Sequence, residues 1–214
     1  MGRGNKKEAV AALHREHIMA AAEQIFSQKG FAQTTIADIS IASQYSRRTI
    51  YAYYESKEDI LHHIIAKGLL ILKQDIESAL QTSSDFSAQY FAICTAMKKY
   101  QIECPHSLDT ITAANTNQLD LDNLSLAVTQ ILSLGTQVNA ILAQFIQSGK
   151  DQGVVRQEIA PLPTVYILWS NITALLTLVH TKGAFIAKAF SMTQDDYLEY
   201  GLKQIINSIL EVRM

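Results

Sequence analysis

The chain has 214 residues, of which 48% are hydrophobic and 18% are charged, so it holds enough apolar residues for a sizeable core. It contains three prolines and nine glycines, and its apolar residues recur at helical spacing nearly throughout, which predicts an all-α protein. The basic N-terminus lacks the apolar segment of a signal peptide. The spacing of Cys94 and Cys104 fits neither a metal site nor a redox pair, so we expect reduced thiols in a cytoplasmic protein.

The formal net charge of −2 is unevenly distributed along the chain. Residues 1–57 carry eight Lys/Arg and five Asp/Glu, whereas residues 58–214 carry ten and fifteen. A positive N-terminal part followed by an acidic remainder is what we expect of a DNA-binding head on an acidic body.

The first expected element is a helix over roughly residues 8–28, which Gly30 ends. The basic segment Met1–Lys7 has two interpretations: a disordered, solvated terminus, or an arm that reaches a neighbouring minor groove. The apolar positions that define the helix are Ile18, Ala21, Ala22, Ile25 and Phe26.

Two short helices are expected next. Thr35 and Asp38 form a capping signature at the start of the first, because each side chain can accept from a free backbone N–H of the first turn. Residues 43–45 form the break, and Ser46 caps the second helix. Two short helices joined by a tight turn are the helix-turn-helix pattern.

The second short helix has side chains that suit a reader of DNA. Ile50 and Tyr54, four residues apart, face inward, while Arg47, Arg48 and Tyr51 lie on the other side. Arginine binds phosphate oxygens and the edge of guanine with two hydrogen bonds, so a polyanion is the partner that this helix fits. The alternative is a pair of solvated arginines on a small surface helix.

Further positions complete a wider pattern over residues 20–65, which consists of Phe31, Thr34, Thr35, Ile36, Asp38, Ile39, Ser46, Thr49, Ile50, Tyr51, Tyr53, Tyr54, Ser56, Lys57 and Glu58. This pattern resembles the TetR family of one-component transcriptional regulators. Two departures from that family are Gln44, where Gly is usual in the turn, and Arg48, where a small residue is common. Gln44 carries a modest cost if the turn needs a positive φ.

The resemblance implies a three-helix helix-turn-helix head, residues 1–56, and a helical effector-binding and dimerisation body, residues 57–214. It also implies a palindromic operator of double-stranded DNA as partner, with Tyr51 and Lys57 on the DNA backbone. The residues expected to contact DNA are Thr35, Ser46, Arg47, Arg48, Thr49, Tyr51, Tyr53 and Lys57.

A longer helix opens at Lys57, where Ser56 and Asp59 repeat the capping signature, and continues to about residue 80. The resemblance implies that its tilt transmits effector binding to the head. His62 and His63 point in different directions from it, which makes a metal or pH-switch role the lesser alternative. The remaining helices are expected near residues 86–101, 108–114, 121–152, 161–180 and 194–212.

The helix over residues 161–180 is the most apolar, but polar residues interrupt it, so we expect a buried helix rather than a membrane span. It and the final helix carry apolar side chains over a wide face, which predicts an interface. The resemblance implies a four-helix homodimer interface, and a monomeric core is the alternative. The expected interface residues are Val165, Trp169, Ile172, Leu176, Leu198, Leu202, Ile205 and Ile209.

The sequence contains no motif of a catalytic nucleophile, phosphate loop or zinc protease, so we expect no enzyme, cofactor or metal site. The resemblance implies a small-molecule pocket in the body, and the few charges on its expected walls favour an apolar or aromatic effector. Ordinary core packing is the alternative for each candidate. The candidate pocket residues are Tyr90, Tyr100, Trp169, Asn171 and His180.

The sequence thus leads to one main hypothesis: a cytoplasmic, homodimeric, DNA-binding regulator that represses transcription until a small molecule releases it. The alternative is a helical interaction protein of the same fold that acts mainly through a protein partner. The exposed arginines favour the first, since an interaction protein has less reason to keep a cationic reading face.

Overall fold

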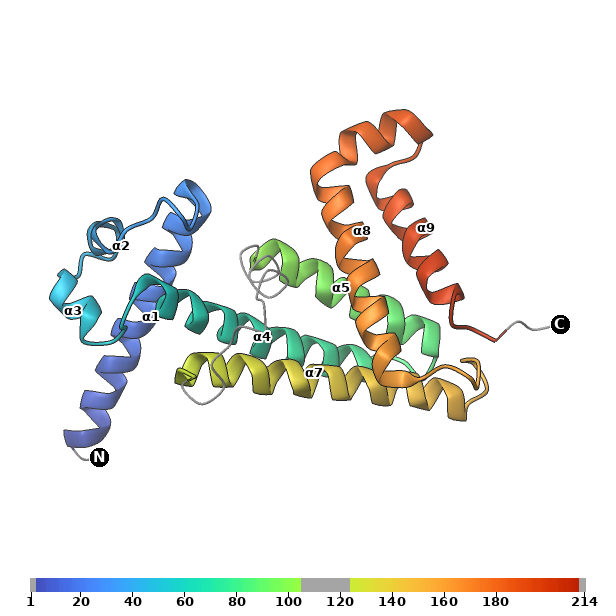
Figure 1. The fold of residues 1–214 in the computed structure, drawn as a ribbon, viewed down its shortest axis with the longest axis horizontal. Helices are drawn as coiled ribbons and strands as arrows, with labels where there is room; N and C mark the ends of the chain where they lie inside the picture. The colour runs from blue at the N-terminus through green and yellow to red at the C-terminus, as the bar shows by residue number, and fades with distance from the viewer. Residues whose placement is uncertain (1–2, 105–123, 212–214) are drawn as a thin grey trace. The chain divides into compact units, whose positions relative to one another are not determined.

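The structure, a computed structural model, describes residues 3–104 and 124–211 (Figure 1). These residues form helices and one isolated antiparallel bridge, between Val155 and Leu210, so the predicted all-α class is confirmed. The expected helix near residues 108–114 lies outside the described residues. The helices are α1 (Arg3–Lys29), α2 (Ile36–Ser43), α3 (Arg47–Tyr51), α4 (Lys57–Gln81), α5 (Phe86–Glu103), α7 (Leu126–Asp151), α8 (Pro161–Phe190) and α9 (Gln194–Asn207).

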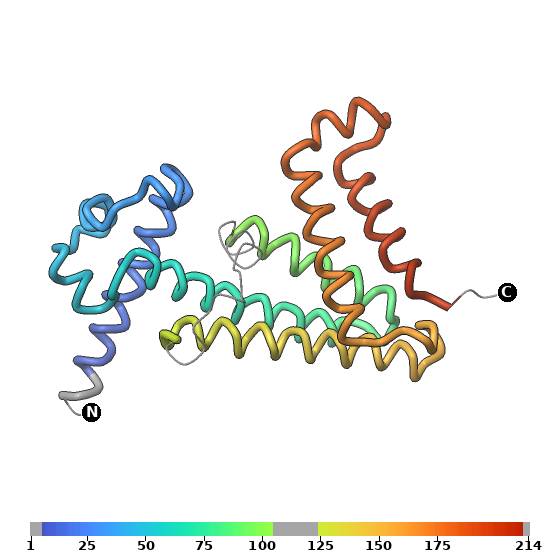
Figure 2. Tube along the Cα trace, in the orientation of Figure 1, coloured from blue at the N-terminus to red at the C-terminus, as the bar shows by residue number. Residues whose placement is uncertain are grey.

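The chain divides into two compact units. Among the described residues, the N-terminal unit comprises 3–67 and 124–131, and the C-terminal unit comprises 68–104 and 132–211. Helix α4 contributes to both, and its trace runs without a break (Figure 2). The division after residue 56 stays a prediction; the first turns of α4 belong to the N-terminal unit.

Each helix of the N-terminal unit places apolar side chains in one core. Phe26 of α1 packs edge-on against Phe31, with ring centroids 5.1 Å apart. Ile39 of α2 and Ile50 of α3 are fully buried, as is Ile60 of α4. The helix-turn-helix is therefore supported from two sides, by α1 and by the start of α4.

Helix α1 begins earlier than the sequence pattern predicts. It starts at Arg3 rather than near residue 8, so the expectation of a disordered Met1–Lys7 is wrong for Arg3–Lys7. The lysines, glutamate and alanines at residues 6–12 have high helix propensity, which extends the helix beyond its apolar face.

In the C-terminal unit, α5 and α7 approach each other closely. The rings of Phe86 and Phe145 stack with centroids 4.3 Å apart and planes inclined by 6°. A Cβ at Gly149 would lie 2.5 Å from Phe86 Cε2 and 2.6 Å from a methyl group of Val155, so only glycine fits there. The hydroxyl of Tyr90 on α5 donates to the carbonyl oxygen of Leu202 over 3.1 Å and links α5 to α9.

Helix α9 ends at Asn207 and not at the expected Val212, which lies outside the described residues. The chain then pairs with the connection between α7 and α8. Arg156 N–H donates to the carbonyl oxygen of Ile209 over 3.1 Å, and Glu211 N–H donates to that of Val154 over 2.8 Å. This pairing satisfies backbone groups that a further helical turn would have used.

The apolar stripes of α8 and α9 that were expected to meet a partner subunit are mostly buried inside this chain, so an interface through them stays a prediction that this burial does not favour. Periodicity shows which residues share a face, but not whether the same chain covers that face. Here α5 packs against both helices. The residues buried within the chain are Val165, Ile172, Leu176, Leu198, Leu202 and Ile209, whereas Trp169 and Ile205 are half-buried.

A different face of the two helices is exposed. Ile167 and Phe185 of α8 are 59% and 68% exposed, and their separation of five helical turns places them on one stripe, with Ala174 between them. Leu162, Tyr166, Phe190 and Tyr200 are further exposed large side chains of α8 and α9.

Within the described residues, α7 and α8 are long and apolar enough to cross a membrane, judged by length and composition only. Core helices of globular proteins meet the same criteria. The sequence predicted a buried helix here, but α8 is only partly buried, because one of its faces is exposed.

Candidate nucleic-acid interface

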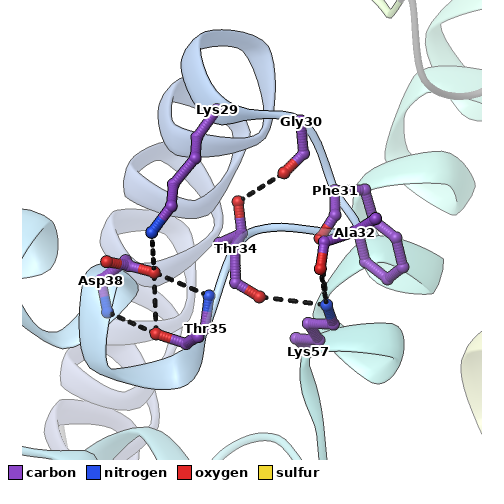
Figure 3. A network of polar contacts seen from close by, with 8 residues as sticks. All are labelled: Lys29, Gly30, Phe31, Ala32, Thr34, Thr35, Asp38 and Lys57. Carbon is purple, nitrogen blue, oxygen red and sulfur yellow. Dashed lines mark hydrogen bonds and ion pairs between the residues drawn. The ribbon is translucent and has the colours of Figure 1, made fainter.

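The start of α2 is held by a reciprocal cap. Thr35 Oγ1 accepts from Asp38 N–H over 3.3 Å, and Asp38 Oδ2 accepts from Thr35 N–H over 2.8 Å, so the predicted capping box is confirmed. Figure 3 shows that Lys29 of α1 also reaches this carboxylate, with Nζ 2.8 Å from Oδ2. These hydrogen bonds, that of Lys29 first and then those of Thr35, lower the pKa of Asp38 to about 2.

The turn between α2 and α3 contains a strained residue. Gln44 has φ 59° and ψ 20°, in the left-handed region that glycine occupies most readily. The condition under which Gln44 was expected to carry a cost, a positive φ in the turn, is therefore met. The hydroxyl of Ser40 donates to the carbonyl oxygen of Tyr45 over 2.6 Å and closes the turn.

Helix α3 is capped by Ser46, whose Oγ accepts from Thr49 N–H over 3.1 Å, as expected. Ile50 anchors the helix in the core. Tyr54, four residues later, is also buried, and its hydroxyl donates to the carbonyl oxygen of Arg15 over 3.1 Å. Burial raises the pKa of Tyr54, which therefore remains protonated.

The outer side of α3 carries the cationic residues. Arg47 and Arg48 are exposed, and among the described residues neither makes a side-chain ion pair or hydrogen bond. Tyr51, the last residue of the helix, is 57% exposed. These three side chains form a surface that a polyanion can reach without breaking an internal contact.

Lys57 has a different environment from the one expected of a phosphate ligand. Its ammonium donates to the carbonyl oxygens of Phe31 over 3.0 Å, Ala32 over 3.4 Å and Thr34 over 3.0 Å (Figure 3). It also lies 4.5 Å from the centroid of the Phe31 ring. All three N–H groups thus have partners in the connection between α1 and α2, so a phosphate contact by Lys57 stays a prediction that this geometry does not favour.

The other expected DNA-binding residues are also partly engaged inside the unit. The Thr35 hydroxyl donates to Asp38 Oδ2 over 2.7 Å, and the hydroxyls of Ser46 and Thr49 are 2.8 Å apart. Tyr53 is half-buried, with its hydroxyl 2.9 Å from Nδ1 of His14. Only Arg47, Arg48 and Tyr51 of the predicted set point outward without such contacts, and sequence reasoning missed the part played by His14.

The predicted pocket residues do not gather at one place. Tyr90 and Trp169 line a cavity of about 30 Å³ among α5, α7 and α8, whose other walls are apolar. His180 lines a separate groove of about 500 Å³ between α5, α8 and α9. Tyr100 is buried beside Gly68, and Asn171 is exposed on α8. The cavity has room for one or two water molecules, and a typical ligand pocket needs ten times that volume, roughly 300 Å³ or more.

No group of three or more His, Cys, Asp or Glu side chains that could hold a metal ion occurs in the part of the chain that the structure describes. His63 has its Nδ1 2.9 Å from the carbonyl oxygen of Asp59, four residues earlier on α4. Burial lowers the pKa of His62, which favours its neutral form.

Residues 18–64 match a family model described as bacterial regulatory proteins, tetR family. The HTH-type transcriptional repressor BepR of Brucella suis is 39% identical over 63 residues, which cover 29% of this chain and 30% of BepR. NicS, an HTH-type transcriptional repressor of Pseudomonas putida, is 26% identical over 184 residues, which cover 81% of this chain and 80% of NicS. The chain therefore spans less than a third of the length of BepR, while its weaker match to NicS includes both units.

Solved structures share the fold over most of the chain. FadR from Bacillus subtilis, in complex with stearoyl-CoA, has a TM-score of 0.67 and 15% identity and covers 91% of this chain and 98% of its own. The fatty acid degradation regulator FadR from Bacillus halodurans has a TM-score of 0.67 and 17% identity, over 90% and 94% of the two chains. At such identities the likeness shows the fold alone: a helical protein with an N-terminal helix-turn-helix.

Proposed function

Because this chain belongs to the TetR family, we propose that it is a DNA-binding transcriptional regulator, a repressor that a small molecule releases from its operator. The observation that carries the proposal is the division of α3 into two sides. Ile50 holds the helix in the core, while the guanidinium groups of Arg47 and Arg48 remain exposed beside Tyr51. A helix held in this way can enter the major groove with its cationic side outward.

The three outward residues have different roles. Arg47 and Arg48 lie in the first turn of the recognition helix, from which side chains reach base edges, and arginine binds guanine O6 and N7 together. Tyr51, at the other end of α3, donates its hydroxyl to a phosphate and fixes the register of the helix on the duplex. Thr35, Ser46 and Thr49 lie at the starts of α2 and α3. They stabilise these helices and do not contact base edges.

The regulator acts as a homodimer that reads a palindromic operator. The support for a second copy of this chain is the apolar stripe of α8 that contains Ile167, Ala174 and Phe185, together with Tyr200 of α9. An exposed apolar surface of this kind marks an interaction site in a soluble protein. A dimer also places two recognition helices on one operator, with the half-site spacing set by the separation of the two heads.

The effector is apolar, at least in the part that enters the body. The walls of the cavity beside Tyr90 and Trp169 are almost entirely apolar, and at about 30 Å³ it must widen to admit a ligand. The FadR structure from Bacillus subtilis was solved with stearoyl-CoA, so a long-chain acyl-CoA is the first ligand to try. An effector that weakens DNA binding must itself be bound more weakly by the DNA complex, by the same factor.

The test begins with genomic DNA fragments bound by the purified wild-type protein, which are recovered and sequenced to find the preferred site. Arg47→Ala and Arg48→Ala should each weaken binding to that site by about 1–3 kcal/mol if the residue contacts a guanine, and non-specific binding should fall much less. Lys182→Ala, an exposed lysine of α8, serves as the control for loss of one positive charge. Recovery of no preferred fragment would contradict the proposal and favour an interaction protein of this fold.

A further inference from the structure

Two tyrosines flank the recognition helix. Tyr45 immediately precedes the N-cap residue Ser46, and Tyr53 follows the last residue of α3 by two positions. Both tyrosines contact the same side chain of α1, His14. The ring of His14 lies 4.9 Å from that of Tyr45, inclined by 51°, and 5.7 Å from that of Tyr53, inclined by 83°.

A hydrogen bond strengthens one of these contacts. Nδ1 of His14 lies 2.9 Å from the hydroxyl oxygen of Tyr53, across 39 residues of chain. The next residue of α1, Arg15, places its guanidinium 5.5 Å from the centre of the Tyr53 ring. The same α1 turn also accepts the Tyr54 hydroxyl at the carbonyl oxygen of Arg15. One turn of α1 therefore holds the segments before and after α3.

We propose that His14 is a positioning residue for the recognition helix: it links both ends of α3 to α1 and so sets the angle at which Arg47 and Arg48 meet DNA. The inference rests on the proposed function. His14 itself does not touch DNA in this assignment. The hydroxyl of Tyr53 bonds to His14 within the protein and does not contact a phosphate.

The need for such a residue follows from the size of α3. The helix has five residues, and isolated helices shorter than about 12 residues do not persist in water. Ile50 is the one buried side chain within α3, so the angle of the helix depends on contacts made by the residues on either side of it. Contacts at Tyr45 and at Tyr53 fix this angle because they act on either side of Ile50.

If His14 positions α3, its loss should reduce the preference for one DNA site over unrelated DNA. If His14 only stabilises the unit, that preference should not change. If α3 pivots, the arginines lose alignment with base edges, whereas attraction to the phosphates, which depends mainly on charge, persists. The readout is therefore the ratio of affinities for the preferred site and for unrelated DNA, together with the unfolding midpoint of each variant.

The experiment compares His14→Phe, Tyr53→Phe and the double variant. His14→Phe keeps a ring beside Tyr45 but removes the hydrogen bond, and Tyr53→Phe removes the same bond from the other partner. Each single variant should lower the affinity ratio by about three- to tenfold. The double variant should lower it no further than either single variant does, because both substitutions remove the same hydrogen bond. His14→Ala, which also loses the ring contacts, should lower it further, by about tenfold or more. His17→Phe, on the exposed side of α1, is the matched control.

The outcomes separate cleanly. If the wild-type protein prefers no DNA site, the proposed function is overturned, and the role of His14 in DNA recognition is overturned with it. A selective wild type together with a His14→Phe variant of unchanged selectivity overturns the His14 inference alone. Equal losses for specific and unrelated DNA, accompanied by a lower unfolding midpoint, also overturn it, because they indicate a residue that only stabilises the unit.

Discussion

The ammonium of Lys57 donates to the carbonyl oxygen of Thr34 over 3.0 Å, although the two residues are 23 positions apart. With the Phe31 carbonyl as a second partner at the same distance, it ties the first residue of α4 to the connection that leads into α2. Lys57→Met should therefore lower the free energy of unfolding by about 1–3 kcal/mol, because carbonyl groups lose charged donors. Chemical denaturation followed by circular dichroism measures this.

The same variant decides whether Lys57 holds DNA. We expect the slope of log affinity against log salt to stay unchanged, since the ammonium faces protein carbonyls. A slope reduced by about one, with unchanged stability, would assign Lys57 to a phosphate instead. Lys67→Met is the control, because its ion pair with Glu16 is exposed and such pairs contribute only about 0–1 kcal/mol.

Asp38 makes the stability of the N-terminal unit depend on acid. Its pKa of about 2 in the folded chain lies below the ordinary value of 3.8, so its contribution is fully present above pH 3.8 and is lost as the pH falls toward 2. Asp38→Asn should be less stable than the wild type at pH 6, and the difference should shrink between pH 4 and pH 2. Denaturation curves at pH 6, 4 and 2.5 measure it; a constant difference would contradict the assignment.

Gln44→Gly should stabilise the turn between α2 and α3. Gln44 has φ 59°, which glycine adopts without the Cβ strain, so we expect a gain of up to about 1 kcal/mol. Gln24→Gly, at an exposed position inside α1, is the matched control and should cost up to about 1 kcal/mol. A loss at both positions would mean that the Gln44 side chain contributes more than its backbone strain costs.

Phe185→Asp and Ile167→Asp should convert a dimer to folded monomers. Both side chains are exposed within one chain, so a charge there disturbs only an interface between copies. Leu202→Asp should instead unfold the C-terminal unit, since Leu202 is 7% exposed and a buried charge costs several kcal/mol. Mass in solution and circular dichroism distinguish the two results; a monomeric wild type at micromolar concentration would contradict the dimer.

Cys94 should resist alkylation in the folded protein. It is buried on α5, and burial raises the pKa of its thiol to about 12, so almost no thiolate is present at pH 8. Cys104, which is half-buried, should react first with iodoacetamide. Peptide mass spectrometry after a timed reaction identifies the modified residue, and rapid labelling of Cys94 would indicate that the α5 packing opens.

Local signals predicted the local structure well. The Thr35–Asp38 capping box, the Ser46 cap and the inward pair Ile50 and Tyr54 all depend on residues three or four positions apart. Such spacing is set by helix geometry alone, so it can be seen in the sequence. The sequence raised the positive φ at Gln44 only as a condition, from the glycine that is usual in this turn, and the structure shows that the condition is met.

Long-range relationships could not be predicted in the same way. The contacts of Lys57 with Phe31 and of His14 with Tyr53 join residues 26 and 39 positions apart, and no spacing rule relates them. The stripes containing Val165 of α8 and Leu202 of α9 were correctly identified as apolar, but the fact that α8, α9 and α5 of the same chain pack together follows only from the tertiary structure. The end of α9 was missed for a similar reason, since the pairing of Leu210 with Val155 replaces a helical turn that the apolar spacing allowed.

That pairing has a consequence for the order in which the protein can fold during its synthesis. The hydrogen bonds that hold α3 and the connection into α2 to α1 and α4 join residues up to Lys57, so they can form while most of the chain is still being made. The connection between α7 and α8 waits much longer, because Val154 and Arg156 bond to Glu211 and Ile209. A ribosome that stalls after α8 would therefore leave a formed N-terminal helix-turn-helix joined to a C-terminal unit whose α7–α8 connection is still unpaired.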